Sequence, residues 1–170
     1  MSRNPLTSFR AGIILSILLV PAVLGQETSI IEDVEVQATI KEGLDNLYNM
    51  RFAEAEFVFS RIDRQHPDHP IGPFLLSLTT WWEILLDLND LSMDDSFFSA
   101  MDEVVDRSDK ILKKNPDDLD AMFFKGAALG FRGRLRSNRG DWFKSAMDGR
   151  KAMNYVLRVA DENSDNNDYV

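Results

Sequence analysis

Three arginines near the C-terminal end of this 170-residue chain are spaced so that one helix face can carry all of them. Arg132, Arg136 and Arg139 stand at positions i, i+4 and i+7, and residues with these spacings share one side of a helix. A guanidinium group can bind a carboxylate or a phosphate through two parallel hydrogen bonds. The spacing therefore predicts a candidate site for an anionic ligand, such as an acidic peptide, a lipid head group or an anionic cell-envelope polymer.

The arginines lie in a basic segment of an acidic chain. From Lys125 to Lys151 there are eight basic and two acidic residues, whereas the whole chain has a formal net charge of -9. An acidic stretch from Asp87 to Asp109 precedes this segment and contains eight acidic residues. Neighbouring helices would bring the two stretches side by side. Internal pairing of the arginines is therefore the competing interpretation, and it is the one that we favour.

Residue types that support catalysis or metal binding are sparse. The chain has no cysteine, which excludes disulfides, cysteine nucleophiles and thiolate metal sites. It has no Gly-x-Ser-x-Gly motif, phosphate-binding loop or His-Glu-x-x-His motif. Its two histidines, His66 and His69, flank a proline turn that should direct them apart, and the acidic segment 161–166 lacks the glycine of a calcium loop. We expect no catalytic residues, no metal and no cofactor, and the acidic balance argues against nucleic-acid binding.

The first 25 residues have the features of a secretion signal. Arg3 and Arg10 precede or border the apolar segment 11–20, Pro21 ends that segment, and small residues follow up to Gly25. The apolar segment is too short for a comfortable membrane span of about 20 residues. We expect cleavage near Gly25, a periplasmic or extracellular location and no stable membrane span after cleavage. An uncleaved N-terminal anchor is the alternative.

Apolar residues in the remaining chain recur at the three- and four-residue spacing of amphipathic helices. In the first such segment these residues are Ile40, Gly43, Leu44, Leu47 and Tyr48. The spacing, with its proline and glycine interruptions, predicts helices at about 33–50, 52–65, 72–88, 95–114, 118–136 and 141–162. The predicted fold class is therefore all-α.

The predicted helices repeat as pairs. Pro67-Asp68 is matched 49 residues later by Pro116-Asp117, and Ser164-Asp165 follows 48 residues further on. Small or apolar residues precede each of these landmarks at the same three distances. They are Ala55, Phe59 and Ile62, then Val104, Ser108 and Ile111, then Ala152, Val156 and Val159. A fixed period is typical of helical repeat proteins, and it divides residues 26–170 into units at about 33–67, 70–116 and 118–164.

The first unit resembles a tetratricopeptide repeat (TPR). Gly43 matches the small residue of that family's first helix, Phe52 the aromatic at the turn, Ala55 the alanine of the second helix and Pro67 the closing proline. The third unit departs from the pattern, because Ser164 replaces the proline, and the periods exceed the family's usual length of about 34 residues. The resemblance implies an exported bacterial protein built as an α-solenoid of about three antiparallel helix pairs.

In TPR proteins the first helix of each pair lines a concave groove. The resemblance places an apolar and aromatic set there, namely Tyr48, Phe74, Leu78, Trp81, Trp82, Phe131 and Arg134. It implies an interaction scaffold that binds a peptide or helix of a partner protein, with Trp81 and Trp82 as anchors. Since adjacent residues of a helix point in different directions, we expect at least one tryptophan in the core.

Two competing interpretations of the groove remain open. In one, its aromatic residues are ordinary core between the helix layers. In the other, further parts of a larger repeat protein cover the groove, and this chain is the N-terminal fragment of that protein.

Overall fold

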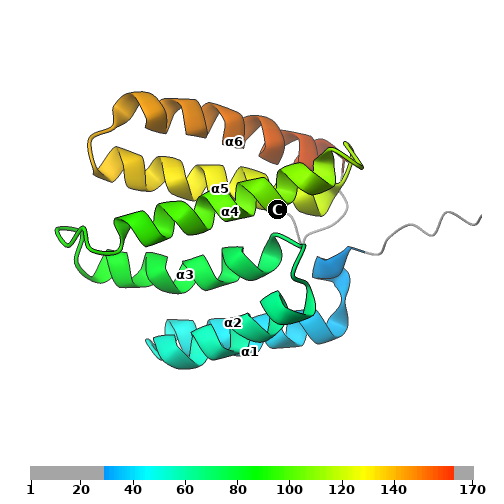
Figure 1. The fold of residues 1–170 in the computed structure, drawn as a ribbon, viewed down its shortest axis with the longest axis horizontal. Coiled ribbons are helices and arrows are strands. Elements are labelled where there is room, and N and C mark those ends of the chain that lie inside the picture. Colours follow the sequence, from blue (N-terminus) through cyan, green and yellow to red (C-terminus); the bar gives the residue numbers. More distant parts are fainter. Residues whose placement is uncertain (1–28, 163–170) are drawn as a thin grey trace, which may run out of the picture.

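The computed structural model describes residues 29–162, in which all regular structure is helical. A short 3-10 helix, η1 (Ile30–Glu32), precedes six α-helices. These are α1 (Val34–Tyr48), α2 (Phe52–Gln65), α3 (Ile71–Leu86), α4 (Asp94–Leu112), α5 (Leu119–Asn138) and α6 (Trp142–Glu162) (Figure 1). The all-α class is confirmed, and every α-helix begins and ends within two residues of its predicted bounds. The predicted signal segment and Ser164 lie outside the described residues.

Local signals explain where several helices begin and where the chain turns. The Asp33 side chain accepts hydrogen bonds from the backbone N–H groups of Glu35 and Val36 at the start of α1. Asp118 caps α5 in the same way, through the N–H of Ala121. Gly140 between α5 and α6 has a φ of 79°, a left-handed conformation that a glycine adopts without steric cost. Capping and turn chemistry therefore fix the ends that periodicity alone leaves imprecise.

Each helix packs against the next one along the chain, and consecutive helices run in opposite directions (Figure 1). Most of the positions that repeat in the sequence are buried at these contacts, whereas Val156 of α6 is exposed. Ala55, Phe59 and Ile62 of α2 are fully buried, as are Val104 and Ser108 of α4. Burial of these faces between neighbours creates one main core that extends from α1 to α5.

Ring contacts join α1, α3 and α5, which are the first helices of the three predicted pairs. The rings of Tyr48 and Trp82 connect α1 with α3 at a centroid distance of 5.8 Å. The rings of Trp81 and Phe131 connect α3 with α5 at 5.4 Å. α3 therefore contacts both α1 and α5 through aromatic side chains.

The segment before α1 reaches across to the third helix pair. The Asp120 carboxylate at the start of α5 accepts a hydrogen bond from the Ser29 hydroxyl at 2.7 Å and from the Ile30 N–H at 2.9 Å. Ile30 and Ile31 also pack against the core. This contact ties together parts of the chain that are about ninety residues apart in sequence.

Candidate functional site

Three of the aromatic residues that were predicted to line a groove face the interior. Phe74 belongs to the buried core, and Trp81 and Phe131 are partly buried against it. The Trp81 ring lies 5.5 Å from the Phe97 ring and 5.4 Å from the Phe131 ring, measured between centroids. Phe74 completes the cluster at 5.9 Å from Phe131. These side chains hold α3, α4 and α5 together, as the interpretation of ordinary core predicts.

Tyr48 and Trp82 lie nearer the surface. Their rings meet edge to face, Tyr48 is 64% exposed and Trp82 is half-buried. The two adjacent tryptophans thus contact different helices: Trp81 contacts α4 and α5, and Trp82 contacts α1. Leu78, one turn before Trp82, is partly buried against the core, and Arg134 is exposed on α5.

Exposed apolar side chains continue from Trp82 through the last turn of α3 and into the loop that follows it. They are Leu85, Leu86, Leu88 and Leu91, and Met50 next to Tyr48 in the α1–α2 turn is exposed as well. We call Tyr48, Met50, Trp82, Leu85, Leu86, Leu88 and Leu91 the apolar end patch. The sequence pattern did not identify the loop leucines of this patch, because helical periodicity does not extend into a loop. The available signal was the presence of two leucines, at positions 88 and 91, in the short connection 87–93.

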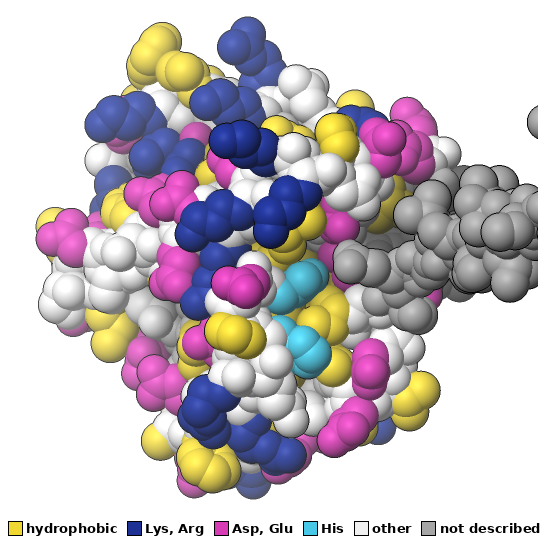
Figure 2. Space-filling view, turned by 45° about the vertical axis from the view of Figure 1, so that its right-hand side comes forward, with side chains coloured by type: hydrophobic (Ala, Val, Ile, Leu, Met, Phe, Trp, Pro, Cys, Tyr) yellow, Lys and Arg dark blue, Asp and Glu magenta, His cyan; other side chains and the backbone are white. Residues whose placement is uncertain are grey.

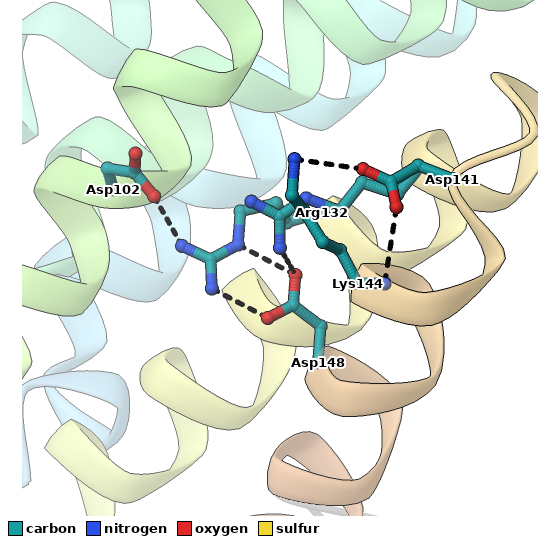
Figure 3. Close-up of polar contacts among 6 residues, drawn as sticks. Asp102, Arg132, Asp141, Lys144 and Asp148 are labelled. Atoms are coloured by element: carbon teal, nitrogen blue, oxygen red, sulfur yellow. Dashed lines mark hydrogen bonds and ion pairs between the residues drawn. The ribbon is translucent and has the colours of Figure 1, made fainter.

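The arginines that were candidates for an anionic ligand are bound to carboxylates within the chain, and Figure 3 shows Arg132 with Asp148 and Asp102. Arg132 donates from Nε and Nη2 to the two oxygens of Asp148, at 2.9 and 2.7 Å, and also pairs with Asp102. Arg136 donates to the same Asp148 carboxylate. The Asp148 side chain is only 4% exposed, so α6 provides one buried carboxylate that holds two guanidinium groups of α5.

The third arginine has its partners on α4 and in the loop before it. Arg139 binds Asp94 through two hydrogen bonds of 2.7 and 2.9 Å and also donates to backbone carbonyls of that loop. Hydrogen bonds to Asp148 and to Asp94 raise the pKa values of Arg132 and Arg139, respectively, although partial desolvation opposes both shifts. Arg132 and Arg139 thus pair with the predicted acidic stretch, through Asp102 and Asp94. Arg136 is also paired within the chain, but its partner Asp148 lies outside that stretch.

The carboxylates of α4 meet the cations of α5 in reverse order. Asp94, Asp102 and Asp109 pair with Arg139, Arg132 and Lys125, as antiparallel neighbours require. Sequence analysis identified this acidic stretch as the partner but missed Asp148, because that residue is an isolated acid inside the basic segment.

Figure 2 shows both histidine side chains on one face of the molecule. Burial lowers the pKa of His69 to about 4, although the negative charge of Asp120 opposes the shift. Nδ1 of His69 accepts a hydrogen bond from the Ile71 N–H at 3.2 Å. Within residues 29–162 no group of three or more His, Asp or Glu side chains is placed to hold a metal ion. Most of the acidic segment 161–166 lies outside the described residues.

Comparisons with known proteins provide no relative: no protein-family profile, curated protein or solved structure matches the chain. Within the described residues, no helix is both long enough and apolar enough to cross a membrane. The arrangement of the described side chains is therefore the basis on which a function can be proposed.

Proposed function

We propose that this chain is an exported, TPR-like interaction scaffold that binds a helix or an extended peptide of a partner protein at the apolar end patch. The observation that carries the proposal is the Tyr48–Trp82 pair, two rings in edge-to-face contact at the surface between α1 and α3. Aromatic side chains with a rigid apolar base are the usual anchors of protein–protein interfaces. Export is proposed from the signal-like features of residues 1–25.

The surroundings of the pair support a binding role. Leu85 and Leu86 are exposed one turn beyond Trp82, and Leu88 and Leu91 extend the apolar surface into the loop. Single exposed leucines are common, whereas four of them within ten residues of Trp82 in the aromatic pair favour an interaction surface. Trp81 and Phe131 lie against the core beside this surface and support it from within. A partner's apolar side chains would therefore meet a surface that is already held in place.

The proposal favours apolar binding over capture of an anion. Arg132, Arg136 and Arg139 are engaged by Asp148, Asp102 and Asp94. An anionic ligand would have to displace a carboxylate that the chain holds against the same guanidinium group. Loss of such a partner from a buried ion pair is costly.

Selection of helical peptides from a displayed library against the purified chain would test this function. Selected peptides should bind the native chain and lose at least about tenfold in affinity against the Tyr48→Ala/Trp82→Ala variant, a loss of about 1.4 kcal/mol or more. Phe143→Ala is the matched control, because Phe143 is an exposed aromatic on α6 and outside the patch. Raising the salt from about 0.1 M to about 1 M should change the affinity little, since the patch is apolar. Peptides that bind the double variant as well as the native chain would refute the proposed site.

A further inference from the structure

Helix α6 carries a second apolar stripe on a side that does not contact α5. The buried side of α6 contains Asp148, Ala152 and Val159 and faces α5, where Val159 forms a small core with Met122. A second line of residues, each one helical turn beyond the previous one, is exposed to solvent. Its members are Trp142, Ala146, Arg150, Met153 and Leu157. We call these five residues the α6 outer stripe. Trp142 at its beginning is 69% exposed.

The same positions on α4 hold the next helix in place. With the repeat offset of 48 residues, the α6 outer stripe corresponds to Asp94, Phe98, Asp102, Val105 and Asp109. The three aspartates form ion pairs with α5, and Phe98 lies against the Arg136 guanidinium of α5 at 5.7 Å. Phe98 and Val105 also pack against the core. The outer stripe is thus the side on which a helix of this repeat receives a following helix.

The chemistry of the stripe differs from that of α4. Where α4 has Asp94, Asp102 and Asp109, α6 has Trp142, Arg150 and Leu157. Lys151, next to Arg150 in sequence, is exposed as well. The surface therefore suits a partner that presents both apolar side chains and carboxylates, since complementary charges favour association and exclude the wrong orientation.

The opposite end of the same molecule has that chemistry. A shallow pocket of about 370 Å³ lies between α1 and α2 and is lined by Glu42, Asn46, Ala53, Glu54, Phe57 and Val58. Phe57 in this pocket is 67% exposed, and Glu42 and Glu54 are exposed carboxylates. Asp45, on α1 close to Glu42 in sequence, adds a further exposed carboxylate. We call the six lining residues the acidic pocket.

We propose that the α6 outer stripe of one copy docks onto the acidic pocket of a second copy, so that copies associate head to tail. Met153 and Leu157 would pack against Phe57 of the second copy. Arg150 would meet Glu54, because Glu42 already pairs with Arg61 at 3.6 Å. After docking, one copy keeps a free pocket and the other copy keeps a free stripe. Association by two different surfaces adds further copies as concentration rises, unless the geometry closes a ring.

Two other occupants fit the stripe less well. If two α6 helices packed together about a twofold axis, Arg150 near the middle of the stripe would approach its own copy, and like charges repel. A lipid surface would have to accept a chain with a net charge of -9, which anionic membranes repel. Both alternatives become distinct outcomes of the test.

Sedimentation equilibrium of the purified chain measures the association directly. The mean mass should rise with concentration and should fall when salt is raised from about 0.1 M to about 1 M. Met153→Glu, at the stripe, and Phe57→Glu, at the pocket, should each abolish the rise. Both residues are exposed, so circular dichroism should show unchanged helix content. Val34→Glu, an exposed apolar position at the start of α1 and outside both surfaces, should associate like the native chain and serves as the control.

A mixture of the two disrupted variants distinguishes the head-to-tail arrangement from a twofold one. Met153→Glu retains an intact pocket and Phe57→Glu an intact stripe, so an equimolar mixture should form a 1:1 complex and grow no further. A native chain that stays monomeric throughout would overturn the proposal. So would a Phe57→Glu variant that still self-associates, which would indicate α6–α6 pairing. Met153-dependent binding to vesicles of phosphatidylcholine and phosphatidylglycerol, with no self-association, would assign the stripe to lipid instead. None of these outcomes bears on peptide binding at the apolar end patch.

Discussion

The ring of Phe59 on α2 occupies the space that a side chain on Gly43 of α1 would need. A Cβ atom placed on Gly43 would lie 2.2 Å from Cε1 of Phe59, well inside the sum of their van der Waals radii. Both residues are buried, so the ring has little room to move away. The absence of a side chain at Gly43 therefore allows the close approach of α1 and α2.

Replacing Gly43 by alanine should destabilise the fold by about 1–3 kcal/mol, because an overpacked core forces side chains and backbone to shift. Gly130→Ala is the matched control on α5, since its added Cβ would lie 4.0 Å from Cβ of Ala152, an ordinary van der Waals contact. That change should stabilise the chain by about 0.5–1 kcal/mol through helix propensity. Urea unfolding measures both effects, and a Gly43→Ala variant as stable as the native chain would contradict the assigned packing.

Removing the buried carboxylate of Asp148 should be among the most damaging single changes. Asp148→Ala leaves Arg132 and Arg136 without their shared partner, and loss of one member of a buried ion pair costs about 3–5 kcal/mol. Asp106→Ala on the exposed side of α4 should leave the free energy of unfolding nearly unchanged. Equal effects of the two substitutions in urea unfolding would show that Asp148 does not bridge the helices.

The two adjacent tryptophans should respond differently to truncation. Trp81→Ala removes a ring that packs against Phe97 and Phe131 and should cost about 3–5 kcal/mol of stability. Trp82→Ala removes a half-buried ring at the surface and should cost clearly less, while it weakens peptide binding at the apolar end patch. Thermal unfolding and peptide affinity, measured on both variants, separate the two roles. A larger stability loss for Trp82→Ala would reverse the assignment.

Acidification should weaken the fold through His69. Its pKa falls from 6.5 to about 4 in the folded chain, so the unfolded chain binds the proton first as pH decreases. The contribution of neutral His69 is therefore complete above about pH 6.5 and is lost as pH falls through about 4, up to a total of about 3 kcal/mol. His69→Gln should show a shallower decline in unfolding free energy over this range. An imidazole that titrates near 6.5 by NMR in the folded chain would contradict this prediction.

Element positions were largely predictable from the sequence, since they depend on local signals. The three- and four-residue spacing around Leu47 and the proline at position 67 locate α1 and α2 to within two residues. The acidic stretch before the basic segment likewise predicted ion pairs between α4 and α5, because antiparallel neighbours must place their side chains together. Asp94–Arg139 and Asp102–Arg132 are such pairs.

How deeply each side chain is buried was not predictable in the same way. Periodicity assigns Trp81 and Trp82 to neighbouring directions, but which of them meets the interior depends on where α4 and α5 lie. The same limit applies to α6, where two apolar faces share one helix and only the position of α5 shows which is covered. The sequence does not identify Asp148 as the link between α5 and α6, because its partners Arg132 and Arg136 are 16 and 12 residues away in the chain.

The contact between Asp120 and the segment at Ser29 and Ile30 has a consequence for the order in which the chain folds. Nearly all other helix contacts join neighbours along the chain, and local contacts of this kind form rapidly. Formation of these hydrogen bonds closes a loop of about ninety residues, and the loss of chain entropy opposes that closure. The N-terminal segment at Ser29 and Ile30 is therefore expected to dock onto α5 last, although it is synthesised first. In hydrogen exchange, the Ile30 amide should exchange well before the amides in the middle of α5, as the first region of the native state to open.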